Sequence, residues 1–151
     1  MIQAVGDVLA FRGRLTRLGY WRWQLALVVI GAGLGYAPVA VAMAGGPRWL
    51  SALAFAPMAL ALVASVGVVT RRLHDRGRGI GWLAVFALAP WSLVGLSIWL
   101  MEGPADLDYR WAVPTAFAAS LASLALSVWG FVEIGLLRGT PGPNRFGPPP
   151  E

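Results

Sequence analysis

The chain contains 151 residues, of which 58% are hydrophobic and 13% are charged. An ordinary soluble domain has roughly 45–50% apolar and about 25% charged residues, so this composition argues against a soluble core. Cysteine is absent and there is 1 histidine, which excludes disulfides, thiolate metal sites, cysteine nucleophiles and multi-histidine metal cages. We therefore expect no metal centre and no cofactor.

Four long stretches carry neither a charged residue nor a histidine. A helix of about 18–20 apolar residues spans a hydrocarbon core roughly 30 Å thick, and each stretch is longer than that. The charge-free stretches cover residues 23–47, 49–70, 79–101 and 111–132. The sequence therefore predicts an all-α membrane protein, a four-transmembrane-helix bundle in one integral membrane domain over residues 1–151, with spans near 23–44, 49–70, 80–101 and 111–133.

The arginines are distributed unevenly between these spans. Four precede the first span, one follows it, four lie in the central loop, one lies in the next loop and two follow the fourth span. Because cytoplasmic loops are enriched in Lys and Arg, this alternation predicts that both termini and the central loop are cytoplasmic. The net charge of +5 does not indicate nucleic-acid binding, since the arginines follow the membrane topology. We expect no nucleic-acid partner.

A short cationic segment, residues 11–23, precedes the first span and ends in aromatic residues. Arg14 and Arg17 are three residues apart and would share one side of a helix, where they meet phosphates or acidic side chains. Tyr20 and Trp21 are typical of the membrane interface. We predict an interfacial amphipathic segment here. The simpler interpretation is that its arginines are topology determinants and lipid anchors.

The central polar segment, residues 70–82, is the most informative stretch of the chain. A carboxylate such as Asp75 can orient a neighbouring imidazole such as His74 and raise its basicity, which would suit acid/base chemistry or metal binding. The further ligands of a phosphohydrolase and a serine in a nucleophile turn are missing from the sequence. The favoured interpretation is structural: Asp75 pairs with a surrounding arginine and His74 caps backbone carbonyls.

The tail, residues 138–151, is rich in Gly and Pro. Such a composition dictates turns followed by a polyproline-like end, and it limits the entropy lost if the tail folds back onto the membrane face. Glu133 is the one acid beside a span on the predicted inner side. We predict that it pairs with an arginine from residues 12–17 or 71–78, because a charge near hydrocarbon costs less when it is paired.

Three segments carry recognisable motifs in a fixed order. They read Phe11-x-Gly13-Arg14-x-x-Arg17-x-x-Tyr20-Trp21, then Arg72-Leu73-His74-Asp75-x-Gly77-Arg78, then Gly139-Thr140-Pro141-Gly142-Pro143-Asn144-Arg145-Phe146-Gly147. Together they resemble the bacterial inner-membrane family catalogued as domain of unknown function 805, over residues 11–150. The resemblance implies a multi-pass protein of the inner membrane and supplies no mechanism. Members usually continue from the second motif into Ser-Gly-Trp-Trp, whereas this chain has Gly79-Ile80-Gly81-Trp82.

On the predicted topology these three segments share the cytoplasmic side. We predict that they assemble into one positively charged polar cap over the helices, flanked by tryptophans. The candidate cap residues are Arg14, Arg17, Tyr20, Trp21, Arg71, Arg72, His74, Asp75, Gly77, Arg78, Glu133, Asn144, Arg145 and Phe146.

The favoured function is a non-enzymatic membrane module whose cap contacts anionic lipid headgroups or a protein partner. Each arginine near an anionic surface contributes about 1 kcal/mol to such binding. One alternative is a transporter or channel subunit, although the spans contain no internal Asp, Lys, Arg or His, which ion pathways usually show. The other alternative is a lipid-modifying enzyme that uses His74 and Asp75.

Overall fold

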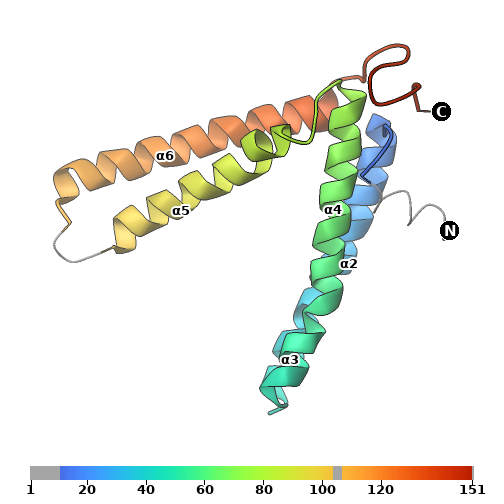
Figure 1. Cartoon of the computed structure of the whole chain (residues 1–151). Helices are drawn as coiled ribbons and strands as arrows, with labels where there is room; N and C mark the ends of the chain where they lie inside the picture. The colour runs from blue at the N-terminus through green and yellow to red at the C-terminus, as the bar shows by residue number, and fades with distance from the viewer. Residues whose placement is uncertain (1–10, 104–106, 151) are drawn as a thin grey trace. The chain divides into compact units, whose positions relative to one another are not determined.

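The computed structural model describes residues 11–103 and 107–150 (Figure 1). Every regular element in this part of the chain is a helix. Four helices are long and apolar enough to cross a membrane, and they run over Arg17–Met43, Arg48–Asp75, Ala84–Glu102 and Tyr109–Leu136. The predicted all-α class and the four membrane-compatible helices are therefore confirmed.

The chain divides into two compact units. The first consists of the described residues up to Arg78 together with the tail from Arg138, and the second runs from Gly79 to Leu137. Packing of all four helices into one bundle and one domain stays a prediction, and each unit is described by itself below.

The first unit is built on α2 (Arg17–Met43), α3 (Arg48–Ala54) and α4 (Ala56–Asp75). Helices α2 and α4 pack against each other (Figure 1). The turn between α2 and α3 contains Gly45 with a φ of +72°, a left-handed conformation that glycine adopts without steric cost. α4 follows α3 after a break at Phe55, and a proline in its first turn fits there because the N–H that proline lacks would have no helical acceptor.

The predicted helical placement of Arg14 is wrong. α2 begins at Arg17, and residues 12–16 are not helical. Thr16 caps the helix with an extended backbone, and its side-chain oxygen accepts a hydrogen bond of 3.0 Å from the backbone N–H of Gly19, which satisfies one of the unpaired N–H groups at a helix start. Arg14 therefore does not share a helix face with Arg17.

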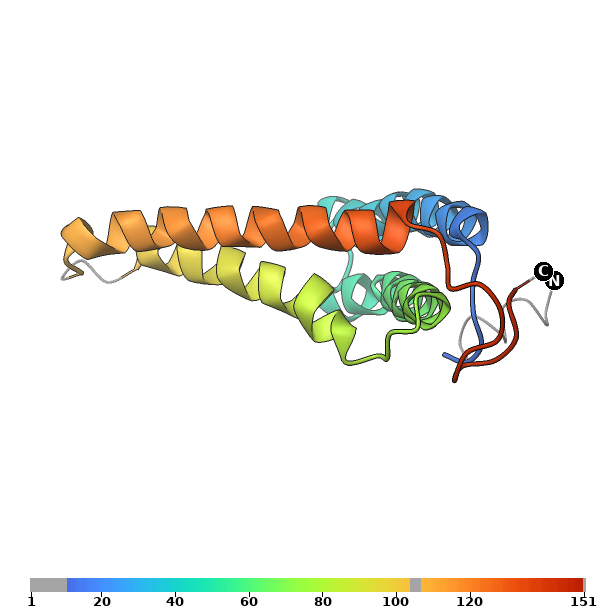
Figure 2. The same ribbon diagram turned by 90° about the horizontal axis from the view of Figure 1, so that it is seen from above.

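The second unit is a pair of helices side by side, as Figures 1 and 2 both show. Its elements are η1 (Ala84–Leu88), α5 (Ala89–Glu102), α6 (Tyr109–Gly130) and η2 (Phe131–Leu136). Small residues such as Ala116 and Ser123 lie buried in α6, and the Ser123 hydroxyl donates a 2.9 Å hydrogen bond to the Pro90 carbonyl. Close helix contact through small residues is typical of membrane proteins.

Wide π-type turns interrupt the helix before Pro90. Proline has no N–H, so the carbonyl four residues earlier, that of Phe86, loses its usual helical donor. A π-turn over Ala84–Leu88 changes the local hydrogen-bond register at this point. Phe86 packs edge-to-face on Trp129, with 5.1 Å between ring centroids, which ties η1 to α6.

The long helices expose most of their apolar surface. Val29 is 71% exposed and Phe117 is 65% exposed, and the most apolar windows of the four spans are 6%, 11%, 17% and 22% buried. A soluble monomer rarely exposes contiguous apolar patches of this extent. Such surfaces suit hydrocarbon, in which the helices also satisfy their own backbone hydrogen bonds.

Candidate functional site

The three motif segments meet at one end of the first unit. The backbone N–H of Leu15, in the segment before α2, donates to the carbonyl of Arg71 in α4 over 3.2 Å, and the N–H of Thr140, in the tail, donates to the carbonyl of Asp75 over 2.8 Å. Figure 1 shows the tail looping beside the end of α4. Segments more than 50 residues apart in sequence therefore form one structure.

A buried charge cluster lies at the centre of this structure. Oδ1 of Asp75 accepts a hydrogen bond from Arg14 Nε at 3.0 Å and forms an ion pair with Arg14 Nη2 at 2.9 Å. Oδ2 accepts a hydrogen bond from Arg72 Nη1. The side chains of Arg14, Arg72 and Asp75 are 1%, 0% and 4% exposed. We refer to these three residues as the Arg–Asp–Arg cluster. Two guanidinium groups share one carboxylate, so the cluster carries a net charge of +1.

Arg14 also forms hydrogen bonds with the tail. Its Nη1 donates to the carbonyl of Gly142 at 2.6 Å and its Nη2 donates to the carbonyl of Thr140 at 2.6 Å. Hydrogen bonds to a charged donor are shorter and stronger than neutral ones. One side chain therefore joins the segment before α2, the end of α4 and the tail.

Gly139 is the residue that lets the tail approach the cluster. A Cβ added at Gly139 would lie 2.5 Å from the carboxylate carbon of Asp75 and 2.6 Å from Oδ1, well inside van der Waals contact. The carboxylate is held from two sides by arginines and cannot move away without breaking those bonds. Only glycine fits this position.

Replacing Gly139 with alanine is therefore expected to displace the tail. We expect the free energy of unfolding to fall by about 1–3 kcal/mol, the usual cost of forcing an added methyl group into a packed site. The amide of Thr140, next in the chain, should exchange its hydrogen faster, which hydrogen-exchange mass spectrometry measures. A Gly95→Ala variant is the matched control, because a Cβ at Gly95 meets nothing within 4 Å. Equal behaviour of the two variants would contradict the close approach.

His74 and Asp75 are directed to different partners. The His74 ring stacks on Phe146, with 3.9 Å between ring centroids and 7° between planes, and its Nδ1 lies 3.1 Å from the carbonyl of Gly13. Asn144 donates from Nδ2 to the carbonyl of His74 at 3.0 Å. The contacts agree with the structural interpretation of this pair from the sequence, because the carboxylate orients arginines and not the imidazole.

The remaining cap residues surround the cluster or lie apart from it. Tyr20 and Trp21 touch edge-to-face at the start of α2, with 5.3 Å between ring centroids. Gly77 lies two residues past the end of α4 with a φ of +71°, and its carbonyl accepts a 3.3 Å hydrogen bond from Arg145. Glu133 is buried in η2 of the other unit, so its predicted pairing with an arginine of the first unit stays a prediction.

The arginines of this end separate into two groups. The described residues of the first unit contain eleven arginines and a single carboxylate, Asp75. Arg14 and Arg72 are buried, whereas the others near this end are exposed or half-buried. We refer to this second group as the cationic face, and its members are Arg12, Arg17, Arg22, Arg71, Arg76, Arg78, Arg138 and Arg145.

A hollow of about 340 Å³, lined by both charged and apolar residues, opens on the cationic face. Its lining contains four arginines and one carboxylate, which gives a local charge of +3, and its apolar rim includes two prolines of the tail. The lining residues are Arg14, Thr16, Arg17, Leu18, Arg72, Asp75, Arg138, Gly139, Thr140, Pro149 and Pro150. This arrangement suits an anionic group of the size of a phosphate ester.

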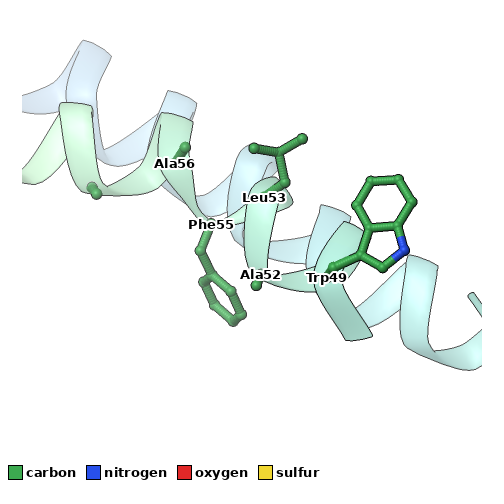
Figure 3. A pocket seen from close by; sticks show the side chains of 6 residues that line it. Trp49, Ala52, Leu53, Phe55 and Ala56 are labelled. Atoms are coloured by element: carbon green, nitrogen blue, oxygen red, sulfur yellow. The ribbon is translucent and has the colours of Figure 1, made fainter. Parts of the chain in front are cut away.

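The larger hollow of the same unit is different in kind. It measures about 560 Å³ and lies where α3 meets α4, among Trp49, Leu53 and Phe55 (Figure 3). The six lining residues are apolar apart from the indole N–H of Trp49, and none of them carries a charge that could orient a ligand. Among the described residues, no group of three or more His, Asp or Glu side chains could hold a metal ion.

Sequence reasoning missed the most closely fitted residues of the site. Gly139, Thr140 and Gly142 stand in the third motif, but they were not among the candidate cap residues. The two glycines contribute a backbone carbonyl and the absence of a side chain, and Thr140 contributes its backbone and a hydroxyl that donates to the carbonyl of Asp75 at 3.0 Å. The available signal was the run of glycines and prolines itself, since glycine inside a motif often marks a close backbone approach.

The fold and the site together define a helical membrane-type protein with a cationic face at one end. Residues 8–148 match the family described as "Protein of unknown function (DUF805)", and the chain belongs to this family, as the three motifs suggested. It is 28% identical over 142 residues to the "Uncharacterized protein YiiR" of Escherichia coli strain K12, covering 93% of this chain and 85% of that relative. The protein of the same name from Escherichia coli O157:H7 matches equally. No solved structure matches the chain.

Proposed function

We propose that this is a protein of the bacterial inner membrane, with both termini cytoplasmic, whose cationic face binds the headgroups of anionic phospholipids. The observation that carries the proposal is the imbalance of charge at one end of the first unit. The one described carboxylate there, Asp75, is already bound by Arg14 and Arg72. Arg12, Arg22, Arg138 and Arg145 of the cationic face are exposed, so anions from outside the protein can reach them.

The two groups of arginines have different roles in this proposal. Arg14 and Arg72 are buried and hold the three segments together, so their main role is to shape the surface. Arginines of the cationic face are accessible to phosphates, which a planar guanidinium binds with two parallel hydrogen bonds. Each contributes about 1 kcal/mol near an anionic membrane surface. The family and its relatives carry no assigned activity, so the proposal rests on the geometry.

A lipid-modifying enzyme built on His74 and Asp75 is less well supported. A general base needs a partner that orients it toward a substrate, and the Asp75 oxygens here bind Arg14 and Arg72. The imidazole is covered on one face by Phe146. These contacts favour a structural role for both residues.

Removing two exposed arginines of the cationic face tests the proposal. We expect an Arg12→Gln/Arg138→Gln variant to bind phosphatidylglycerol about 30-fold more weakly than wild type, from the loss of two contributions of about 1 kcal/mol each. Native mass spectrometry of delipidated protein, titrated with the lipid in a mild detergent, gives the affinity. Added salt should weaken wild-type binding as well, because exposed charges are screened.

An Arg48→Gln/Arg110→Gln variant is the matched control. It loses the same charge from exposed arginines outside the cationic face. We expect it to bind phosphatidylglycerol like wild type. Equal weakening of both variants would show that net charge alone matters, and unchanged binding in both would redirect the search to a protein partner; either result refutes the proposal.

A further inference from the structure

A separate groove runs between α2 and α4 inside the spans of the first unit. Its volume is about 320 Å³. Six of the lining residues are apolar or glycine, and the two polar ones face each other across the helices. The lining consists of Gln24, Leu27, Val28 and Gly31 from α2 and Met58, Ala61, Leu62 and Ser65 from α4.

The polar pair leaves hydrogen-bonding capacity unused. Gln24 Nε2 donates to Ser65 Oγ at 3.0 Å, and Ser65 Oγ donates back to Gln24 Oε1 at 3.3 Å. A primary amide has two N–H hydrogens, and the described residues give the second one no acceptor. A polar hydrogen left unpaired at membrane depth is costly, because hydrocarbon offers no water to accept it.

The position of this pair along α2 matches the layers of a bilayer. Gln24 follows Arg17 of the cationic face by seven residues, which is about 10.5 Å along a helix and returns to the same side. The polar interfacial layer on each side of the hydrocarbon core is about 5–8 Å thick. With Arg17 at the level of the lipid phosphates, as the proposed function requires, Gln24 reaches the depth at which the headgroup layer gives way to the acyl chains and the ester groups of a glycerolipid lie.

The deeper part of the groove is open and apolar. Gly31 lies another seven residues along α2, and a Cβ built at Gly31 meets nothing within 4 Å. Leu27 and Met58 also line the groove. An alkyl chain would fill this space without displacing a polar group.

We propose that this groove binds one glycerophospholipid, whose ester carbonyl accepts the second N–H of Gln24 and whose acyl chain lies over Gly31. The inference rests on the proposed function for the choice of a phospholipid as ligand, and it adds that recognition extends from the headgroup to the acyl chain. It assigns the cationic face and the groove to two parts of one binding site.

Filling the groove tests the inference independently of the headgroup. The full-length protein is titrated in native mass spectrometry with dioleoyl phosphatidylglycerol and with dioleoyl phosphatidylethanolamine, which share acyl chains and differ in headgroup charge. We expect Gly31→Leu to weaken both lipids about tenfold and to leave the preference for phosphatidylglycerol unchanged. Gly33→Leu is the matched control: it also has open space around its Cβ position, but it does not line the groove.

A second pair of variants tests the hydrogen bond. Gln24→Leu should weaken both lipids by about threefold to tenfold, the range for one lost hydrogen bond, whereas Ser65→Ala should bind them at least as well as wild type, because it leaves the Gln24 amide for the lipid. Circular dichroism checks that each variant keeps its helices. Gly31→Leu should keep them, because leucine has a higher helix propensity than glycine.

The outcomes separate the two proposals. If Gly31→Leu binds both lipids like wild type, the groove is not a lipid site, whatever the headgroup preference. If Gln24→Leu and Ser65→Ala behave alike, the ester hydrogen bond is wrong. If wild type binds the two lipids equally at low salt, the headgroup proposal fails, while a loss in Gly31→Leu would still establish the groove.

Discussion

Replacing Asp75 with asparagine will lower the free energy of unfolding by about 3–5 kcal/mol, the usual cost of breaking a buried ion pair from one side. The substitution keeps the size of the side chain and removes its charge. Arg14 and Arg72, whose side chains are 1% and 0% exposed, would then be buried without a counter-charge. Unfolding curves in mixed micelles, followed by circular dichroism, give the difference.

Asp108→Asn is the control for this measurement. Asp108 is exposed and caps α6 by accepting a 2.9 Å hydrogen bond from the N–H of Arg110, and asparagine caps helices as well as aspartate does. We expect a change within about 0.5 kcal/mol. A comparable loss in the two variants would show that Asp75 is not a buried counter-charge.

A double-mutant cycle would then measure the coupling directly. Removing Arg14 in the Asp75→Asn background should cost less than removing it from wild type, since one unpaired cation disappears together with its contacts. Residues in direct contact usually couple by 0.5–3 kcal/mol. If the two losses of stability simply add, Arg14 and Asp75 do not stabilise each other, and each substitution acts through other contacts.

The sequence predicts the membrane-compatible helices well, because hydropathy is a property averaged over about 20 residues. Errors of a few residues at a helix end do not change such an average. The fourth helix, for example, was expected over 111–133 and runs over Tyr109–Leu136. The helical nature of each span followed from composition alone, whereas the π-type turns over Ala84–Leu88 and Phe131–Leu136 did not.

The sequence did not predict the role of Arg14, because the partners of this residue are far away along the chain. Spacing relates Arg14 to Arg17, three residues away, whereas the structure pairs it with Asp75, 61 residues away, and with Thr140, 126 residues away. Local periodicity contains no information on such contacts. The cap at Thr16 was the one local signal that a helix begins only after Arg14.

The sequence also treats all arginines alike, since each counts equally toward membrane orientation. The structure distinguishes neighbours: Arg72 is fully buried and bonded to Asp75, whereas Arg71 is half-buried. Substituting Arg72 would disturb the Arg–Asp–Arg cluster before it altered any lipid contact. A test of lipid binding is therefore cleaner at exposed positions such as Arg12 and Arg138.

Arg14→Lys, a substitution that preserves the charge, will be nearly as damaging as removing the side chain. The guanidinium of Arg14 meets the Asp75 carboxylate with Nε and Nη2 and the carbonyls of Gly142 and Thr140 with Nη1 and Nη2. A lysine ammonium is a single point charge and lacks this planar fork. We expect a loss of about 3 kcal/mol, from at least one or two charged hydrogen bonds at 1.5–3 kcal/mol each.

Arg12→Lys provides the comparison, because Arg12 is exposed and a surface substitution should change stability by no more than about 0.5 kcal/mol. Faster hydrogen exchange at the Thr140 amide in Arg14→Lys, but not in Arg12→Lys, would locate the damage at the tail. If both lysine variants are as stable as wild type, charge alone holds the three segments together. The forked geometry of Arg14 would then be incidental, and the cationic face would need another explanation for its shape.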